Sequence, residues 1–174
     1  LERRPELAEL MASGDGEAAL RAAKQVRATD VASALRQERL GLALVLAVGD
    51  LAGAFDLYKV MRELSTFADR ALHAAIEAAI RKRVPDAEPA GMIGLALGKH
   101  GAGELNYSSD IDPILLYDPA TLPRRERDEP GEAAQRYARE TVRLLSEVTS
   151  EGYVFRVDLR LRPASEVSPL ALPL

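Results

Sequence analysis

The chain has 174 residues, of which 47% are hydrophobic and 29% are charged, and its formal net charge at pH 7 is −4. This composition is typical of a globular domain of ordinary size, and the acidic balance argues against nucleic-acid binding through a broadly basic surface. With no cysteine and two histidines, the chain excludes a disulfide framework and a thiolate metal site and disfavours a histidine-rich zinc site. No apolar run approaches the roughly 20 residues of a membrane helix and no signal peptide is recognisable, so we expect a cytoplasmic protein without membrane contact.

The first half of the chain, up to about residue 84, has the composition of helices. Thr29 or Asp30 is suited to cap a helix. The apolar stripe of that helix is predicted to comprise Leu35, Leu40, Ala43, Leu44 and Ala47. Residues 49–53 predict a break before a second long helix.

This second helix ends in Arg81, Lys82 and Arg83, three cations that suit the negative end of a helix dipole. Its apolar stripe comprises Leu57, Val60, Met61, Leu64, Phe67, Ala68, Ala71, Leu72, Ala75, Ile76 and Ile80. Residues 85–89 read as a linker.

The second half alternates strands and helices. Residues 92–97 and 111–117 predict two strands, and 119–131 predict a mobile loop rich in charge and proline. Residues 131–150 predict a helix, ended by Gly152, whose apolar stripe is Ala134, Tyr137, Ala138, Val142, Leu145 and Val148. Strict alternation over 153–161 predicts a third strand. The order predicts an α+β fold, with a helical segment at 1–89 and a core at 90–174 that is incomplete at its carboxyl end.

Two aspartates stand out on the second predicted strand. Asp110 and Asp112 are spaced i, i+2, so their side chains share one face with Cα atoms roughly 6.5 Å apart. Two such carboxylates repel each other unless a cation lies between them, and hard oxygen ligands of this kind suit Mg²⁺. The alternative is a solvent-facing pair at a strand end, because an Asp-x-Asp spacing alone is not specific.

A third aspartate lies among arginines on the last predicted strand. Alternation places Asp158 on one face together with Val154, Arg156, Arg160 and Arg162, and places Tyr153, Phe155, Val157, Leu159 and Leu161 on the packed face. Guanidinium groups bind phosphate oxygens in a bidentate manner, so this face suits a phosphate-bearing ligand. The alternative is an exposed edge strand whose charges prevent aggregation.

A glycine-bearing turn connects the first two strands. Gly98, Gly101 and Gly103 allow backbone N–H groups to approach a phosphate, although the spacing is not that of a Walker A loop. Lys99 either contacts a phosphate or covers the surface, and His100 is more often a structural residue than a base.

Residues 97–112, with their Ser-Asp-x-Asp, and the segment 152–163 together resemble the DNA polymerase β type nucleotidyltransferase superfamily. More narrowly, they resemble the bacterial glutamine synthetase adenylyltransferase and adenylyl-removing enzyme family, strongly over about residues 90–165. The resemblance implies a polymerase β-like mixed sheet with flanking helices. It implies one of two activities: transfer of AMP from ATP to a tyrosine of glutamine synthetase, or removal of that AMP by phosphorolysis, which releases ADP. Arginine at position 156 favours the amino-terminal, adenylyl-removing half.

The resemblance also implies roles for individual residues. Asp110, Asp112 and Asp158 would be catalytic and would hold two divalent metal ions, expected to be Mg²⁺. The nucleotide, ATP or ADP, would be held by Gly98, Lys99, Ser109, Arg160 and Arg162. Adenylylated glutamine synthetase and, through the longer parent enzyme, a PII-type nitrogen signal protein would be the partners.

The sequence departs from the family pattern at Pro113, where an aliphatic residue is usual, and proline is poorly tolerated in a central strand. We therefore expect a bend just after the aspartates. A non-catalytic nucleotide-binding module is the competing interpretation of the domain, although retention of all three carboxylates argues against it.

Overall fold

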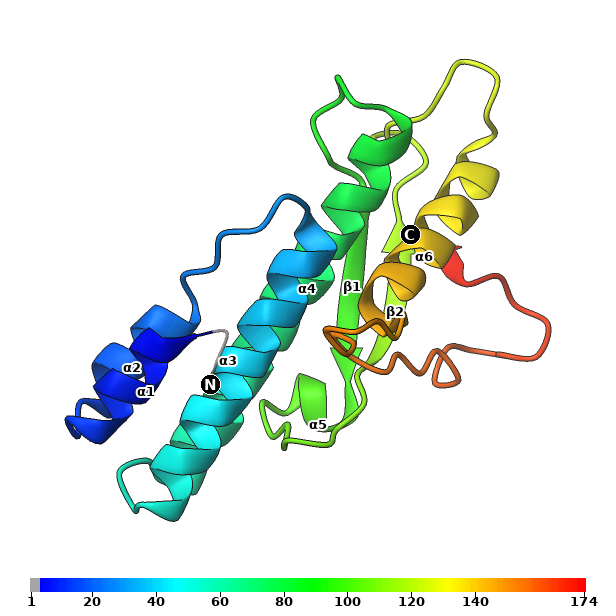
Figure 1. Cartoon of the computed structure of the whole chain (residues 1–174). Helices are drawn as coiled ribbons and strands as arrows, with labels where there is room; N and C mark the ends of the chain where they lie inside the picture. Colours follow the sequence, from blue (N-terminus) through cyan, green and yellow to red (C-terminus); the bar gives the residue numbers. More distant parts are fainter. Residues whose placement is uncertain (1–3) are drawn as a thin grey trace.

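The computed structural model describes residues 4–174, and its first half consists of helices (Figure 1). Two short helices, α1 (Pro5–Ala12) and α2 (Gly16–Ala23), pack against each other and against the long helix α3 (Val31–Leu51). Helix α3 in turn packs on α4 (Leu57–Arg83), the longest helix of the fold. The predicted helical half is thus confirmed for the described residues, while residues 1–3 lie outside them.

Aspartates begin three of these helices. The side chains of Asp15, Asp30 and Asp56 each accept a hydrogen bond from a backbone N–H in the first turn of α2, α3 and α4. Each carboxylate thereby satisfies one of the amide groups that a helix start leaves without a partner. Of the two residues suggested for the start of α3, Asp30 is therefore the cap, and Arg81, Lys82 and Arg83 form the last turn of α4 as predicted.

A three-stranded sheet follows, in the order β1 (Met92–Leu97), β2 (Asp112–Tyr117) and β3 (Ala171–Pro173). Strands β1 and β2 are antiparallel, with Met92 opposite Tyr117 and Leu97 opposite Asp112. Between them lies the one-turn helix α5 (Gly98–Gly101), and α6 (Pro130–Ser146) crosses over between β2 and β3, which are parallel. The observed class is α+β with a mixed sheet, as predicted.

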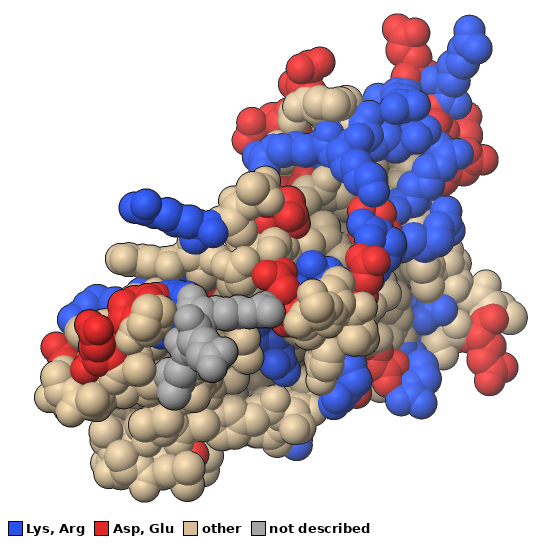
Figure 2. Space-filling model, viewed as in Figure 1, with Lys and Arg blue, Asp and Glu red and all other residues tan. Residues whose placement is uncertain are grey.

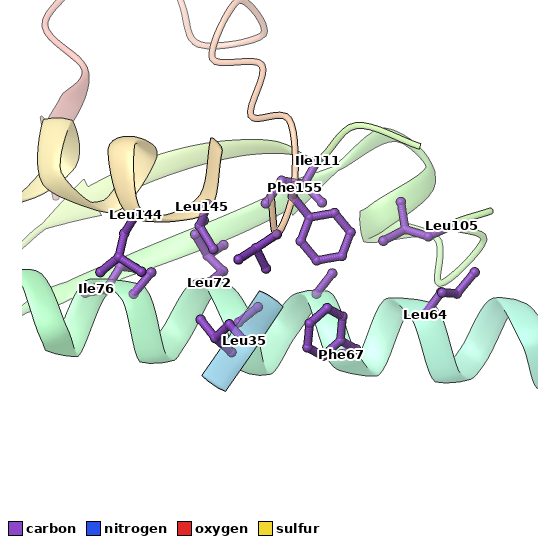
Figure 3. Close-up of a cluster of buried hydrophobic side chains, with 14 of the residues drawn as sticks. Leu35, Leu64, Phe67, Leu72, Ile76, Leu105, Ile111, Leu144, Leu145 and Phe155 are labelled. Atoms are coloured by element: carbon purple, nitrogen blue, oxygen red, sulfur yellow. The ribbon is translucent and has the colours of Figure 1, made fainter. Parts of the chain in front are cut away.

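Helices α4 and α6 lie side by side and cover one face of the sheet. A methyl group on Gly94 of β1 would come within 2.5 Å of Leu72 of α4, and one on Gly131 of α6 would lie 3.2 Å from the hydroxyl of Tyr117. The buried side chains form one cluster across helices and sheet, part of which is drawn in Figure 3: Leu35, Leu64, Phe67, Leu72, Ile76, Leu105, Ile111, Leu144, Leu145 and Phe155.

The other face of the sheet is apolar and open. Ile93 and Leu95 of β1 point away from α4 and are 54% and 49% exposed. Their cross-strand neighbours on β2, Leu116 and Ile114, continue this face, and Asp112 lies at its end. The predicted carboxylates therefore belong to the uncovered face of the sheet.

Several sequence expectations about element ends and stripes are wrong. Helix α3 continues through Gly49 to Leu51, and α6 ends at Ser146 rather than near residue 150. Leu40, Leu57 and Val148, all assigned to apolar stripes, are exposed, whereas Leu42, Val45 and Leu46 of α3 are buried. The stripe of α3 was misplaced because this helix is packed from two sides, by α2 and by α4.

The third strand predicted over 153–161 is also wrong. This segment touches the sheet through a single parallel bridge, Ile111 to Val157, and β3 is the later stretch Ala171–Pro173. The expected alternation fails because Val154 and Phe155 are both buried. Their backbone N–H groups both donate to the carbonyl of Leu145 at the end of α6, which turns this part of the segment away from β2.

Charged side chains cluster where α4 ends and α6 begins, at the upper right of Figure 2, with both signs interspersed. Asp128 links these elements, because Arg83 of α4 and Arg136 of α6 both donate to its carboxylate. The loop that carries it is further held by Leu122, which is buried, and by the hydroxyl of Tyr137, which donates to the carbonyl of Pro123. Among the described residues, no helix is long and apolar enough to span a membrane.

Candidate functional site

The site is built on the bridge between Ile111 and Val157. The N–H of Ile111 donates to the carbonyl of Arg156, and the N–H of Asp158 donates to the carbonyl of Ile111. This parallel register aligns position 110 with 156 and position 112 with 158. Because Ile111 is fully buried, its sequence neighbours point to the open face. The predicted carboxylates Asp110, Asp112 and Asp158 are therefore gathered on one face, although the strand expected to carry the third one is absent.

Two of the three carboxylates are paired with arginines. Nε of Arg156 lies 2.5 Å from Oδ1 of Asp110, and its Nη2 donates to the carbonyl of Ser108 at 2.7 Å. Arg160 donates from Nε and Nη2 to Asp158, and its backbone N–H donates to the same carboxylate. These hydrogen bonds hold the pKa of Asp158 below its usual value.

Asp112 has the opposite electrostatic environment. Its pKa is raised, first by partial burial and then by the negative charges of Asp158 and Asp110, against the smaller opposing effects of Arg160 and His100. The three carboxylates thus act on one another, which is the repulsion that the Asp-x-Asp spacing predicts.

The glycine turn lies directly beside Asp112. Gly98 has φ +57°, and a Cβ atom there would lie 3.2 Å from Oδ2 of Asp112. A left-handed backbone and a close carboxylate both favour glycine at this position. Lys99 follows it and is exposed at the start of α5.

Asn106 shapes the turn that leads into β2. Its side-chain oxygen accepts from the backbone N–H of Ser108 and from the hydroxyl of Ser109, and this hydroxyl accepts from the N–H of Asn106. The hydroxyl of Ser109, predicted to line the nucleotide phosphates, is thus engaged within its own turn. Asn106 was missed by the sequence reasoning, although asparagine two residues before a serine is a recognisable turn signal.

The predicted pair Arg160 and Arg162 is divided by the structure. The side chain of Arg160 is 85% exposed next to Asp158, whereas Arg162 is half-buried and donates to the carbonyls of Leu159 and Ser165. The expectation that both project from one strand face is wrong, because residues 160–168 form turns and bends rather than a strand.

Pro113 leaves the sheet intact. Strand β2 runs through it from Asp112 to Tyr117, opposite Ala96 of β1. Nitrogens two residues apart on a strand point to the same side, so the nitrogen of Pro113, like the N–H of Ile111, faces the side of Arg156. On that side, β2 next pairs at Leu115, with Ala171 of β3. The missing N–H therefore breaks no hydrogen bond between strands. The proline also does not interrupt the strand after the aspartates, as had been expected, because β2 continues through it.

Three carboxylates beside a glycine turn on an α+β sheet are the arrangement that the resemblance to nucleotidyltransferases predicts. The family model for glutamate-ammonia ligase adenylyltransferase matches residues 3–174, and the chain belongs to this family.

The curated relatives include bifunctional glutamine synthetase adenylyltransferase/adenylyl-removing enzymes. The enzyme of Caulobacter vibrioides is 46% identical over 80% of this chain, that of Xanthobacter autotrophicus 43% over 82%, and that of Rhizobium meliloti 36% over 99%. The matched region makes up only 15%, 16% and 18% of these proteins, respectively.

Proposed function

We propose that this domain catalyses nucleotidyl transfer on glutamine synthetase, in the direction that removes AMP from an adenylylated tyrosine by phosphorolysis. An oxygen of inorganic phosphate attacks the α-phosphorus, the bond between this phosphorus and the tyrosyl oxygen breaks, ADP forms, and the tyrosyl oxygen takes up a proton. The observation that carries the proposal is the bridge between Ile111 and Val157, because it brings Asp110, Asp112 and Asp158 to one face beside Gly98.

The types of side chain present suit a divalent metal ion. Asp158 and Asp110 place negative charge around Asp112, and hard carboxylate oxygens are the ligands that Mg²⁺ prefers. Within residues 4–174, however, the side chains form no grouping of three His, Cys, Asp or Glu arranged around one point. Asp110, Asp112 and Asp158 are the residues that would hold Mg²⁺, and a bound ion would activate the attacking oxygen and neutralise the leaving group.

The remaining side chains bind and orient the substrates. The exposed guanidinium of Arg160 and the open backbone of Gly98 and Lys99 are suited to phosphate oxygens. Positioning and charge stabilisation supply most of the rate in such transfers, so this set needs no separate protein base.

Arg156 supports the removing direction. Its guanidinium lies against Asp110, on the face where an anionic phosphate has to approach an anionic AMP group. A cation at this position lowers the repulsion between the two substrates, whereas an acidic residue would increase it.

The deciding experiment measures two reactions, in the full-length protein and in its Asp112→Asn variant. These are ADP formation from adenylylated glutamine synthetase with inorganic phosphate, and pyrophosphate formation from ATP with unmodified glutamine synthetase. Loss of ADP formation alone supports phosphorolysis by this domain, and loss of pyrophosphate formation alone assigns it to the adenylyltransferase half. If the variant keeps both activities, the domain is a non-catalytic regulatory module. A PII-type signal protein is a proposed partner of the longer protein and is tested by its effect on the same rate.

A further inference from the structure

One buried titratable side chain next to the site has no part in the chemistry described above. His100 is the third residue of α5, and its side chain is 1% exposed, whereas its neighbours Gly98, Lys99 and Gly101 are exposed. A buried imidazole on so short a turn has to be explained by its contacts.

His100 contacts the long helix α4. Its Nε2 atom lies 2.9 Å from Oδ1 of Asp69, whose side chain is 69% exposed, and its Nδ1 atom is buried without a hydrogen-bond partner in the described structure. Because a carboxylate accepts hydrogen bonds, Nε2 is the donor in this contact.

A second contact ties the same segment to the same helix. The backbone N–H of Leu105 donates to the hydroxyl of Ser65 at 3.2 Å, in a buried position. Ser65 and Asp69 are four residues apart and so lie on one face of α4. Helix α4 thus holds the segment 100–105 at both of its ends.

This anchoring fixes the residues that face the carboxylates. A side chain at Gly101 would overlap the carbonyl of Ala96, so the turn lies tightly against β1. At the start of the turn Gly98 lies against Asp112. We therefore expect a shift of His100 to move Gly98, two residues earlier, relative to Asp112.

We propose that Asp69 and His100 form a positioning pair for the glycine turn, which sets the affinity for nucleotide phosphates through Gly98 and Lys99 without touching the reacting atoms. The role in affinity rests on the proposed function, while the anchoring itself does not. The pair acts on ground-state binding, so its loss raises the dissociation constant of the nucleotide and leaves kcat nearly unchanged.

The experiment uses Asp69→Ala and Asp69→Asn in the full-length protein, because Asp69 is exposed and its replacement does not threaten folding. Asp69→Ala removes the acceptor, and we expect the Kd for ADP to rise about fivefold to tenfold, of the order of one lost hydrogen bond, with kcat within about twofold. Hydrogen exchange of the amides in 98–105 should become about tenfold faster. Asp69→Asn keeps an oxygen acceptor and should stay within about twofold of the wild type in all three readouts. Glu77→Ala, which removes another carboxylate of α4 whose partners His73 and Arg81 lie on that helix, is the matched control.

Unchanged exchange in Asp69→Ala overturns the anchoring. Faster exchange with an unchanged Kd overturns the role in nucleotide binding, and so does an equal loss of affinity in Asp69→Asn, because charge rather than the hydrogen bond would then be responsible. If the wild-type protein binds no ADP, the proposed function fails, and the exchange measurement still decides whether Asp69 anchors the turn.

Discussion

At the scale of single residues, a substitution at Asp112 should affect turnover and stability in opposite directions. The pKa of Asp112 is raised in the folded state, first by partial burial and then by the negative charges of Asp158 and Asp110. An acid whose folded-state pKa exceeds the unfolded value opposes folding once it is ionised. Asp112→Asn should therefore lower ADP release by about 10²–10³ or more while leaving the melting temperature at pH 7 unchanged or higher. A melting temperature well below that of the wild type, or near-normal turnover, would contradict this assignment.

The two arginines after Asp158 should respond differently to the same conservative change. Arg162 donates to the carbonyls of Leu159 and Ser165 and is half-buried, so Arg162→Lys should lower the free energy of unfolding by about 1–2 kcal/mol. Arg160 is solvated, so Arg160→Lys should stay within about 0.5 kcal/mol and instead weaken phosphate use. Denaturant titrations and the phosphate dependence of ADP release measure the two effects. Equal losses of stability would show that both arginines are structural.

At the scale of elements, Glu140 joins the two helices that cover the sheet. It accepts from Arg143 within α6 and from Lys82 of α4, and these contacts, that of Arg143 foremost, lower its pKa from 4.5 to about 2. A depressed pKa stabilises the fold above the unfolded value, and this contribution is lost as the pH falls from 4.5 toward about 2. Glu140→Gln should therefore lower the melting temperature at pH 7, and the difference from the wild type should shrink across that range.

Glu132→Gln is the matched control for this change, because Glu132 lies on the same helix and pairs with Arg136 one turn away on that helix. Its melting temperature should stay close to that of the wild type throughout. If the effect of Glu140→Gln is the same at pH 7 and at pH 3, the link between the helices does not depend on the ionised carboxylate.

The elements that the sequence predicts correctly are those with local signals. Asp30 marks a helix start, and short apolar runs predict β1 and β2 nearly to the residue. The segment 153–161 has strand-like alternation, but its backbone bonds to the end of α6 and the ring of Tyr153 stacks with Arg39 of α3. Such long-range contacts cannot be predicted from the local sequence pattern. For the site, the resemblance to the family predicts that Asp158 lies near Asp112, whereas the turn that engages Arg162 and the contact of His100 with α4 were not predicted.

At the scale of the whole molecule, the sheet is covered on one face only. Ile93 and Leu95 leave an apolar surface next to the carboxylates. Leu95→Gln should reduce binding of a hydrophobic dye to the 174-residue chain and change its free energy of unfolding by no more than about 0.5 kcal/mol, because this side chain is half-exposed already. Fluorescence of the bound dye measures the first effect, and a denaturant titration measures the free energy of unfolding. A large loss of stability would place Leu95 in the core.

The bridge between Ile111 and Val157 also has a consequence for motion. Two backbone hydrogen bonds join the segment of Asp158 to Ile111 at this point, whereas β1 and β2 are paired over six residues. We therefore expect the amide of Asp158 to exchange through a local opening that leaves β1 and β2 paired. Such an opening would separate Asp158 from the other two carboxylates, so the lifetime of their arrangement would follow local rather than global stability.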